Sequence, residues 1–345
     1  MTERDERFED WFDGEASPDV RRALLELVGR PVSPSRALFD LDLDAYRQRK
    51  ADWIDARLEA SLTDGLPNNV GKRNTARFTD LLDRVGRGCV VPFVGAGMSV
   101  PSGMPGWSDF LALLASESGC KRVVTSEMRK GRFEDAATVV VERLGVNAFR
   151  ERYRSSFQLR GLPQGAVRTL PKIASGAVVT TNFDPVLEHT FGPSLRPVLL
   201  GHQSSDFCRC VASGQTALLK LHGDIDNAES RVLTKSEYDG AYGGDGRFDF
   251  ALPIPRGLRV LFSTVTMLFV GCSLGADRTL GLFRHLVDRE DARYLPQHYA
   301  ILPYRTGAVG ERFLEERHIF PIWYPNGRHE VLDALLEHLA GEAGK

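Results

Sequence analysis

The sequence predicts an α/β protein built on a parallel β-sheet, and two observations carry this prediction. Short, largely apolar runs bounded by glycine or polar residues recur through the C-terminal two thirds of the chain, and helical patterns alternate with them. Such runs are typical of strands buried on both faces of a sheet. The first run, Cys89–Val94, leads directly into a glycine loop, Gly95-Ala96-Gly97-Met98-Ser99. A buried strand followed by such a turn indicates a Rossmann-like fold.

Residues 1–84 contain no glycine loop and no convincing strand, so we expect an N-terminal helical appendage there. Amphipathic patterns cover residues 19–28 and 44–62, and a third helical stretch at 74–85 leads into the first strand. The appendage is either a collar that packs on the main domain or a contact surface for an oligomer or a partner, and the pattern leaves both open. The predicted domains are therefore residues 1–84 and 85–345.

A helical module is predicted to be inserted after the glycine loop, over residues 107–172. Apolar residues recur there at helical spacing, among them Phe110, Leu114, Val140 and Phe149. About 60 residues of helix thus separate the first strand from the next convincing one, more than the dozen or so that a single crossover requires. We therefore expect a lid or a small module that covers part of the sheet.

The remaining strands and helices alternate, as expected for a parallel sheet covered on both faces. The predicted strands are 177–181, 217–221, 267–271, 298–302 and 319–324. The predicted helices between and after them are 185–190, 277–288, 309–317 and 330–339. Ligands of such sheets lie beyond the carboxyl ends of the strands. The polar residues that end these strands are therefore the candidates for function.

Composition and charge exclude several classes of protein. The formal net charge of −2 provides no overall positive field, so direct binding of nucleic acid is not expected. The N-terminal residues lack the apolar core of a signal peptide, and the most apolar run, 265–270, is far too short to span a membrane. The five cysteines form no disulfide framework and no zinc site. We expect a cytoplasmic protein without a metal.

The glycine loop taken alone has two readings. Gly95 and Gly97 allow a phosphate to approach the backbone amides, but a tight turn needs glycine even when it binds nothing. An ordinary dehydrogenase is disfavoured, because its third glycine is replaced by Val100 and the acidic residue at the expected distance, Glu117, lies inside a helical stretch.

Each of the later strand ends also has a structural and a functional reading. Asn182 and Asp184 can bind a ribose or can cap the following helix. His222, at the end of a parallel strand and before Gly223, can transfer a proton near neutral pH or can be a structural histidine. The turn from Gly271 to Ser273 can hold a second polar part of a ligand or can cap a helix.

The combination of these motifs is more specific than any one of them. Four motifs occur in order, each at a strand end: Gly95-Ala-Gly-x-Ser99, Thr181-Asn-x-Asp184, Leu221-His-Gly223 and Gly271-x-Ser-Leu274. With this set, residues 86–340 resemble the sirtuin superfamily, and more closely the divergent sirtuin-like NADase domains of bacterial antiphage defence systems. Gly103-Met-Pro-Gly-Trp107 and Ile322-Trp-Tyr-Pro325 also resemble the divergent branch.

The resemblance implies roles for these residues, with NAD as substrate. Asn182 and His222 would be catalytic: Asn182 would orient the ribose or the attacking water, and His222 would bond a ribose hydroxyl or take a proton from the nucleophile. The implied NAD-binding residues are Gly95, Ala96, Gly97, Ser99, Thr181, Asp184, Gly271, Cys272 and Ser273.

Two departures from the protein deacylases of the superfamily favour water as the acceptor. Their Gly-Ile-Pro-Asp-Phe-Arg is replaced here by Gly103-Met-Pro-Gly-Trp-Ser108, and the four cysteines of their zinc module are missing. We therefore expect an NAD+ glycohydrolase that depletes NAD+ during phage infection. The alternatives are an NAD-dependent protein deacylase and a catalytically silent subunit that binds NAD or ADP-ribose.

Such an enzyme must be silent before infection, because loss of NAD+ is lethal. We expect control by assembly, since residues 1–84 are too small and plain for a sensor domain. The expected assembly is a homo-oligomer. The resemblance further suggests a HerA-like ATPase or a short Argonaute as a possible partner.

Overall fold

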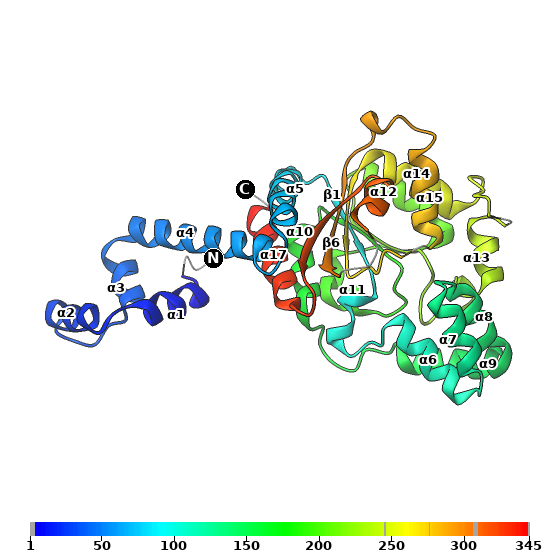
Figure 1. Ribbon diagram of the computed structural model, residues 1–345, viewed down its shortest axis with the longest axis horizontal. Helices are drawn as coiled ribbons and strands as arrows, with labels where there is room; N and C mark the ends of the chain where they lie inside the picture. The colour runs from blue at the N-terminus through cyan, green and yellow to red at the C-terminus, as the bar shows by residue number, and fades with distance from the viewer. Residues whose placement is uncertain (1–3, 245, 276, 306–309, 344–345) are drawn as a thin grey trace. The chain divides into compact units, whose positions relative to one another are not determined.

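The computed structural model describes residues 4–244, 246–275, 277–305 and 310–343 (Figure 1). The chain divides into two compact units, residues 1–64 and 65–345. The sequence placed a domain boundary after residue 84, whereas this division falls between Asp64 and Gly65. The helix that follows, α5 (Asn68–Gly86), packs on the last strand and on the last helix of the large unit.

The N-terminal unit is entirely helical in its described part and encloses a small aromatic core. Its helices are α1 (Glu6–Glu15), α2 (Pro18–Val28), α3 (Pro34–Leu41) and α4 (Leu43–Thr63). Each begins with a side-chain cap, from Asp5, Ser17, Ser33 and Asp42 in turn, and such caps satisfy backbone amides that the first turn leaves open. Phe8, Tyr46 and Trp53 form the core. By contrast, α2 buries none of its residues.

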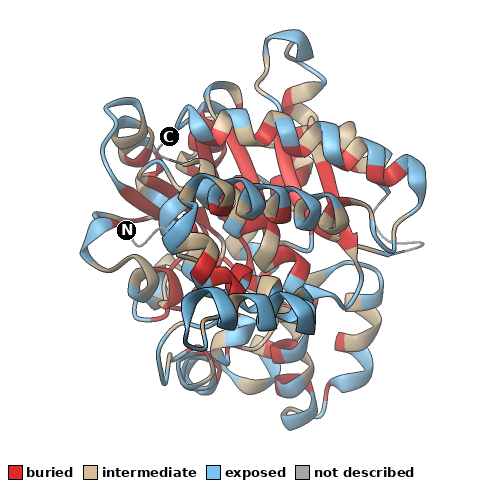
Figure 2. Cartoon of the chain, turned by 90° about the vertical axis from the view of Figure 1, so that its left-hand side faces the viewer, coloured by how far each residue is buried: buried red, intermediate tan, exposed pale blue. Residues whose placement is uncertain are grey.

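The large unit is built on a parallel sheet, which confirms the predicted fold class. The strands are β1 (Val90–Val94), β2 (Ala177–Thr180), β3 (Val198–Leu200), β4 (Ala217–Lys220), β5 (Thr266–Val270), β6 (His298–Tyr304) and β7 (Ile319–Pro325). Their order is β3-β4-β2-β1-β5-β6-β7, and every neighbouring pair is parallel. All residues of β1, β2, β4 and β5 are buried, and strands of the sheet are accordingly red in Figure 2. These apolar strands can be recognised in the sequence because both of their faces are covered.

Helices cover both faces of this sheet (Figure 1). One face carries α12 (Ser204–Ala212), α14 (Pro253–Thr264) and α15 (Arg278–Val287), and the other carries α5, α10 (Leu170–Ile173) and α17 (His329–Glu342). Three further helices are short: α11 (Val186–Phe191), α13 (Lys235–Tyr242) and α16 (Glu311–Glu315). After β1, the chain first adds β2, β3 and β4 on one side of β1, and it then returns to add β5, β6 and β7 on the other side. The ends of β1 and β5 are thus the switch point at which such sheets bind ligands.

Between β1 and β2, the chain forms the helical cluster α6 (Trp107–Glu117), α7 (Lys121–Arg129), α8 (Phe133–Leu144) and α9 (Val146–Ser156). These helices share a core around Phe110, Phe149 and Tyr153. Phe183 and Ile225, from the loops after β2 and β4, belong to the same core. The helical module therefore packs against the carboxyl edge of the sheet, next to the predicted site residues.

A buried side-chain amide attaches α5 to β7, the last strand in the order of the sheet. Asn74 is fully buried; its Nδ2 donates to the carbonyl oxygen of Trp323 at 2.8 Å, and its Oδ1 accepts from the Trp323 N–H at 2.9 Å. The side chain thereby takes the place of a neighbouring strand beside β7, the last strand in the order.

We expect Asn74→Ala to lower the free energy of unfolding by about 2–4 kcal/mol, because it leaves two buried backbone groups unpaired. Urea denaturation followed by circular dichroism measures this change. Thr79→Ala, on the exposed side of the same helix, is the matched control and should change stability by less than about 0.5 kcal/mol. Equal stability of the two variants would contradict the role given to Asn74.

Candidate active site

Two loops at the centre of the carboxyl edge touch backbone to backbone. The N–H groups of Gly95 and Gly97 donate to the carbonyl oxygens of Val270 and Gly271, both at 2.9 Å. A Cβ atom at Gly95 would lie 2.5 Å from the Gly271 oxygen, and one at Gly97 would lie 2.9 Å from it. Gly271 has φ of +66°, and a Cβ there would lie 2.6 Å from the Met98 nitrogen. All three glycines are required by this contact.

The contact leaves few loop amides for a phosphate. The N–H groups of Gly95 and Gly97 donate hydrogen bonds to the end of β5 and the loop after it. Those of Met98 and Ser99 donate to carbonyl groups within the glycine loop itself. Among the described residues, the Ala96 N–H of this loop makes no hydrogen bond, so it is the amide available to a ligand. From the sequence, these glycines could serve either phosphate binding or a tight turn. The structure shows that close packing against the loop after β5 requires them.

The loops after β1 and β2 are joined by side chains that were predicted to form the site. Ser99 Oγ donates to Asp184 Oδ1 at 3.0 Å and accepts from Asn182 Nδ2 at 3.1 Å. The three side chains are buried, and burial raises the pKa of Asp184. Thr180 secures the base of this arrangement, since its hydroxyl donates to the Val94 oxygen and accepts from the Asn182 N–H. The amide of Asn182 is therefore held in one orientation.

His222 follows β4 and is enclosed by two tyrosines of α13. Its Nε2 lies 2.8 Å from Tyr242 Oη, and its Nδ1 lies 3.4 Å from Tyr238 Oη. Tyr242 Oη in turn lies 3.1 Å from Thr279 Oγ1, at the start of α15. Burial lowers the pKa of His222 to about 4, so the imidazole is neutral at physiological pH.

The sheet register places Asn182 and His222 on neighbouring strand ends. Thr180 of β2 is paired with Lys220 of β4, and each candidate residue comes two positions later. Both side chains are nearly buried, at 5% and 7% exposure. Asn182 faces the loop after β1, whereas His222 contacts α13. The two are adjacent in the fold but belong to separate hydrogen-bonded groups.

The other predicted residues are less closely connected to this cluster. The Cys272 thiol contacts the carbonyl oxygens of Phe93 and Val270, and burial raises its pKa. Thr181 is half-buried and Ser273 is exposed, and in the described part of the chain neither side chain bonds to Asn182, Asp184 or His222.

Lys220 was not among the predicted site residues, yet it ties the loops after β2 and β4 together. Its side chain is fully buried, and its Nζ donates to the carbonyl oxygens of Phe183 and Asp184, both at 3.0 Å. The same nitrogen contacts Glu188 Oε1 at 2.7 Å and Asp224 Oδ2 at 2.5 Å. Burial opposes the charge, but the two carboxylates outweigh it and raise the pKa of Lys220. A lysine at the end of an otherwise apolar strand was the available signal.

Arg278 connects the helical module to the site, and sequence reasoning missed it as well. Its guanidinium pairs with Glu134 of α8 at 2.7 Å and with Asp239 of α13 at 2.6 Å, and its Nη1 donates to the Gly243 oxygen. It also lies over the ring of Tyr238. The tyrosines around His222 are therefore attached to α8 through one arginine (α8 and α13 are labelled in Figure 1).

Two features are absent from the described residues. No group of three or more His, Cys, Asp or Glu side chains has an arrangement that could hold a metal ion. No described helix has the length and apolar character needed to cross a membrane.

Comparisons with known proteins show which families this chain is similar to. Residues 176–322 match the SIR2-like domain family. The NAD(+) hydrolase ThsA of Enterococcus faecium is 25% identical over 252 residues, covering 71% of this chain and 48% of that protein. The NAD(+) hydrolase ThsA of Cytobacillus dafuensis is 23% identical over 268 residues, covering 71% of this chain and 52% of that protein. The chain thus spans about half the length of these relatives. Together, these similarities support a divergent, sirtuin-like domain in this chain.

Proposed function

We propose that this chain is an NAD+ glycohydrolase, which cleaves NAD+ to nicotinamide and ADP-ribose. The observation that carries the proposal is the buried Ser99–Asn182–Asp184 cluster beside the switch point of the sheet, with a neutral His222 at the neighbouring strand end. The printed names of the two ThsA relatives support the same reaction. The missing Asp and Arg after the glycine loop argue against an acyl-peptide substrate.

In this proposal the dinucleotide lies across the loops after β1 and β5. The Ala96 N–H and the backbone around Gly95, Gly97 and Ser99 approach the diphosphate, while Gly271, Cys272 and Ser273 lie toward the adenosine half. Thr181, Asn182 and Asp184 face the nicotinamide ribose. Asn182 is well suited to that position, because Ser99 engages its Nδ2 and leaves its Oδ1 for a ribose hydroxyl or a water.

The reaction needs little acid–base assistance. The bond between C1′ of the ribose and the pyridinium nitrogen breaks, and nicotinamide leaves with the electron pair as a neutral molecule. Water adds to C1′, and its proton passes to solvent or to a neighbouring base. The site must chiefly hold the sugar and admit one water.

A neutral imidazole fits such a site as a hydrogen-bonding group. The low pKa of His222 makes it a weak base, which is adequate for water that attacks an electron-poor sugar carbon. Both ring nitrogens face tyrosine hydroxyls, and the contact with Tyr238 is the longer one. We infer that a ribose hydroxyl replaces Tyr238 at Nδ1, while Tyr242 keeps the ring oriented.

We further propose that the enzyme is an antiphage effector controlled by assembly. The N-terminal unit supports a contact surface, because Leu27 and Leu41 are 75% and 69% exposed and α2 buries none of its residues. A second copy of the chain is the proposed occupant. A HerA-like ATPase or a short Argonaute remains a proposal that rests on resemblance alone.

We expect purified protein, once activated, to release nicotinamide and ADP-ribose from NAD+ without an acylated peptide. His222→Ala should lower the rate by about 10²-fold, the low end of the range for a positioned acid–base group. Asn182→Ala should lower the rate as well, because the ribose or the attacking water loses the amide that orients it. Chromatography of the products measures this, with the candidate partner present and absent. His189→Ala, an exposed histidine on α11, is the matched control.

Three outcomes would contradict this proposal. Nicotinamide release that depends on an acylated peptide would indicate a deacylase. Binding of NAD+ without turnover under every condition tested would indicate a silent subunit. Rates close to wild type in both variants would remove Asn182 and His222 from the reaction.

The low pKa of His222 predicts the pH dependence of the reaction. The imidazole stays neutral in the folded protein until the pH approaches about 4, so we expect the rate of nicotinamide release to be level from pH 8 to about 5.5. Because this pKa lies below the unfolded value of 6.5, the folded state loses stability as the pH falls from 6.5 toward 4. Melting temperatures at each pH separate this loss from a change in rate. A rate that halves near pH 6.5 while the fold is intact would contradict the assignment.

Lys220→Met should lower the free energy of unfolding by about 3–5 kcal/mol, because it leaves the Glu188 and Asp224 carboxylates without their buried cation. Lys220→Arg should recover part of this loss by keeping the charge. Lys130→Met, which removes an exposed lysine paired with Glu127, is the control and should cost at most about 1 kcal/mol. Denaturant titration of the three variants measures these differences. An unchanged stability of Lys220→Met would show that the contacts of Lys220 with Glu188 and Asp224 do not stabilise the fold.

A further inference from the structure

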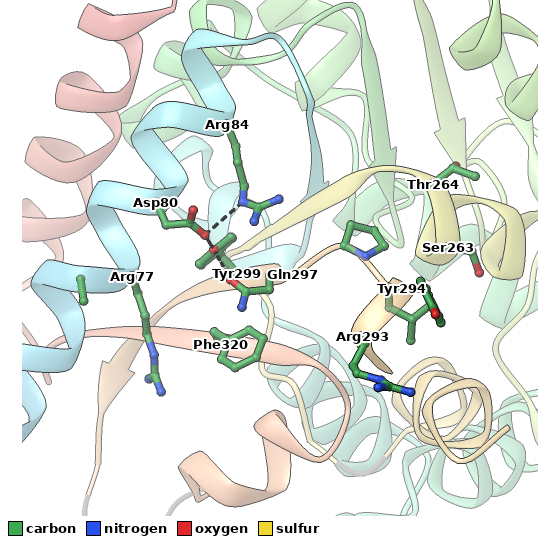
Figure 3. Close-up of a pocket in the computed structure, with 13 residues that line it drawn as sticks. Arg77, Asp80, Arg84, Ser263, Thr264, Arg293, Tyr294, Gln297, Tyr299 and Phe320 are labelled. Carbon is green, nitrogen blue, oxygen red and sulfur yellow. Dashed lines mark hydrogen bonds and ion pairs between the residues drawn. The ribbon is translucent and has the colours of Figure 1, made fainter. Parts of the chain in front are cut away.

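A cavity lies at the amino-terminal ends of the strands, opposite the carboxyl ends that hold the candidate active site. It has a volume of about 780 Å³ and lies where β5, β6 and β7 begin, between α5 and the segment 293–297 that precedes β6 (Figure 3). This volume is in the range of small-molecule sites, roughly 300–1,000 Å³. Nothing in the proposed reaction uses this cavity.

The residues that line the cavity carry more positive than negative charge. Three arginines line it, Arg77, Arg84 and Arg293, against one carboxylate, Asp80. Arg77 is already paired with Glu311 and Glu315. The positive charge that can meet a ligand therefore comes from Arg84 and Arg293, which stand on α5 and on the segment before β6 (Figure 3).

Arg84 is held in place for an anion. Its Nε pairs with Asp80 at 3.1 Å, and its Nη1 donates to Thr266 Oγ1 at 3.2 Å. Asp80 is itself in hydrogen-bond contact with the hydroxyl of Tyr299. The guanidinium also interacts with the hydroxyl of Tyr299, and its Nη2 takes part in neither the contact with Asp80 nor that with Thr266. A guanidinium fixed in this way loses little freedom when it binds.

Arg293 can exchange its present partner for a ligand. It pairs with Asp291 at 2.6 Å, and the two side chains are 83% and 39% exposed. Exposed ion pairs of this kind contribute little to stability, so a doubly charged phosphate competes well with one surface carboxylate.

An aromatic ring lies beside these charges. Tyr294 follows Arg293 in the sequence, lines the cavity and is 82% exposed. An exposed ring next to arginines suits a flat base, because bases stack on aromatic faces. Asp80 and Gln297 also line the cavity and can accept hydrogen bonds from ribose hydroxyls or base amines.

We propose that this cavity binds a nucleotide, with its phosphates held by arginines of the lining and the base against Tyr294. A free phosphate would fill only a small part of the volume, and it would make no use of the exposed ring of Tyr294. The site is separate from the NAD+ pocket proposed above, since the two lie at opposite ends of the strands of one sheet. It is therefore independent of the proposed reaction.

Isothermal titration of the full chain with adenosine diphosphate and with inorganic phosphate tests the proposal. Arg84→Gln and Arg293→Gln should each weaken binding of the diphosphate by about tenfold or more, the loss expected for one charge-assisted hydrogen bond. Tyr294→Ala should weaken adenosine diphosphate but not inorganic phosphate. Arg209→Gln, an exposed arginine on α12, is the matched control and should bind as wild type.

The active site could also take up the diphosphate, so Asn182→Ala is titrated in parallel. Binding that persists in this variant and is lost in Arg84→Gln belongs to the cavity. Binding that is lost in Asn182→Ala and unchanged in Arg84→Gln, or no binding at millimolar ligand, overturns the proposal. Equal weakening of both ligands by Tyr294→Ala overturns the assignment of the base. Thermal melts confirm that each variant is folded.

Discussion

The candidate site depends on the close contact between the loops after β1 and β5. Because Gly95, Gly97 and Gly271 have no side chains, the two backbones can meet at the centre of the sheet. Their hydrogen bonds then fix the position of the turn that follows β1. That position brings Ser99 to Asn182 and Asp184. A side chain at any of the three glycines would displace the turn, and with it the hydroxyl that orients the Asn182 amide. The geometry of the site thus begins with a packing constraint.

The parts of the fold that could be predicted are those with a strong local signal. The buried strands β1, β2, β4 and β5 are apolar runs, and the helices of the inserted module show their period in Phe110 and Val140. Strand β3 was missed because three residues, two of them only half-buried, carry almost no pattern. Helices α1 and α3 were missed for a similar reason, since short polar helices rely on the caps Asp5 and Ser33 more than on a long apolar face.

The sequence predicted which residues could belong to the candidate site, but it did not predict most of their contacts. Asn182, Asp184 and His222 could be found because polar residues at the ends of parallel strands gather at one edge. Their partners could not be found in this way. Tyr238 and Tyr242 come from α13, the α-helix after β4, and Arg278 comes from α15 and reaches Tyr238; only packing brings these side chains around His222. The buried charge of Lys220 is stable only because two carboxylates and two carbonyl groups converge on it, which no local pattern encodes.

The position of Arg278 has a consequence for any movement of the helical module. One guanidinium joins α8 to α13, and α13 supplies both hydroxyls that surround the imidazole. Displacing a tyrosine from His222 therefore perturbs an ion pair with Glu134, and pulling α8 away perturbs the tyrosines in return. Linkage of this kind is reciprocal in free energy. Any ligand that displaces a tyrosine from His222 would thus also act on the attachment of the helical module.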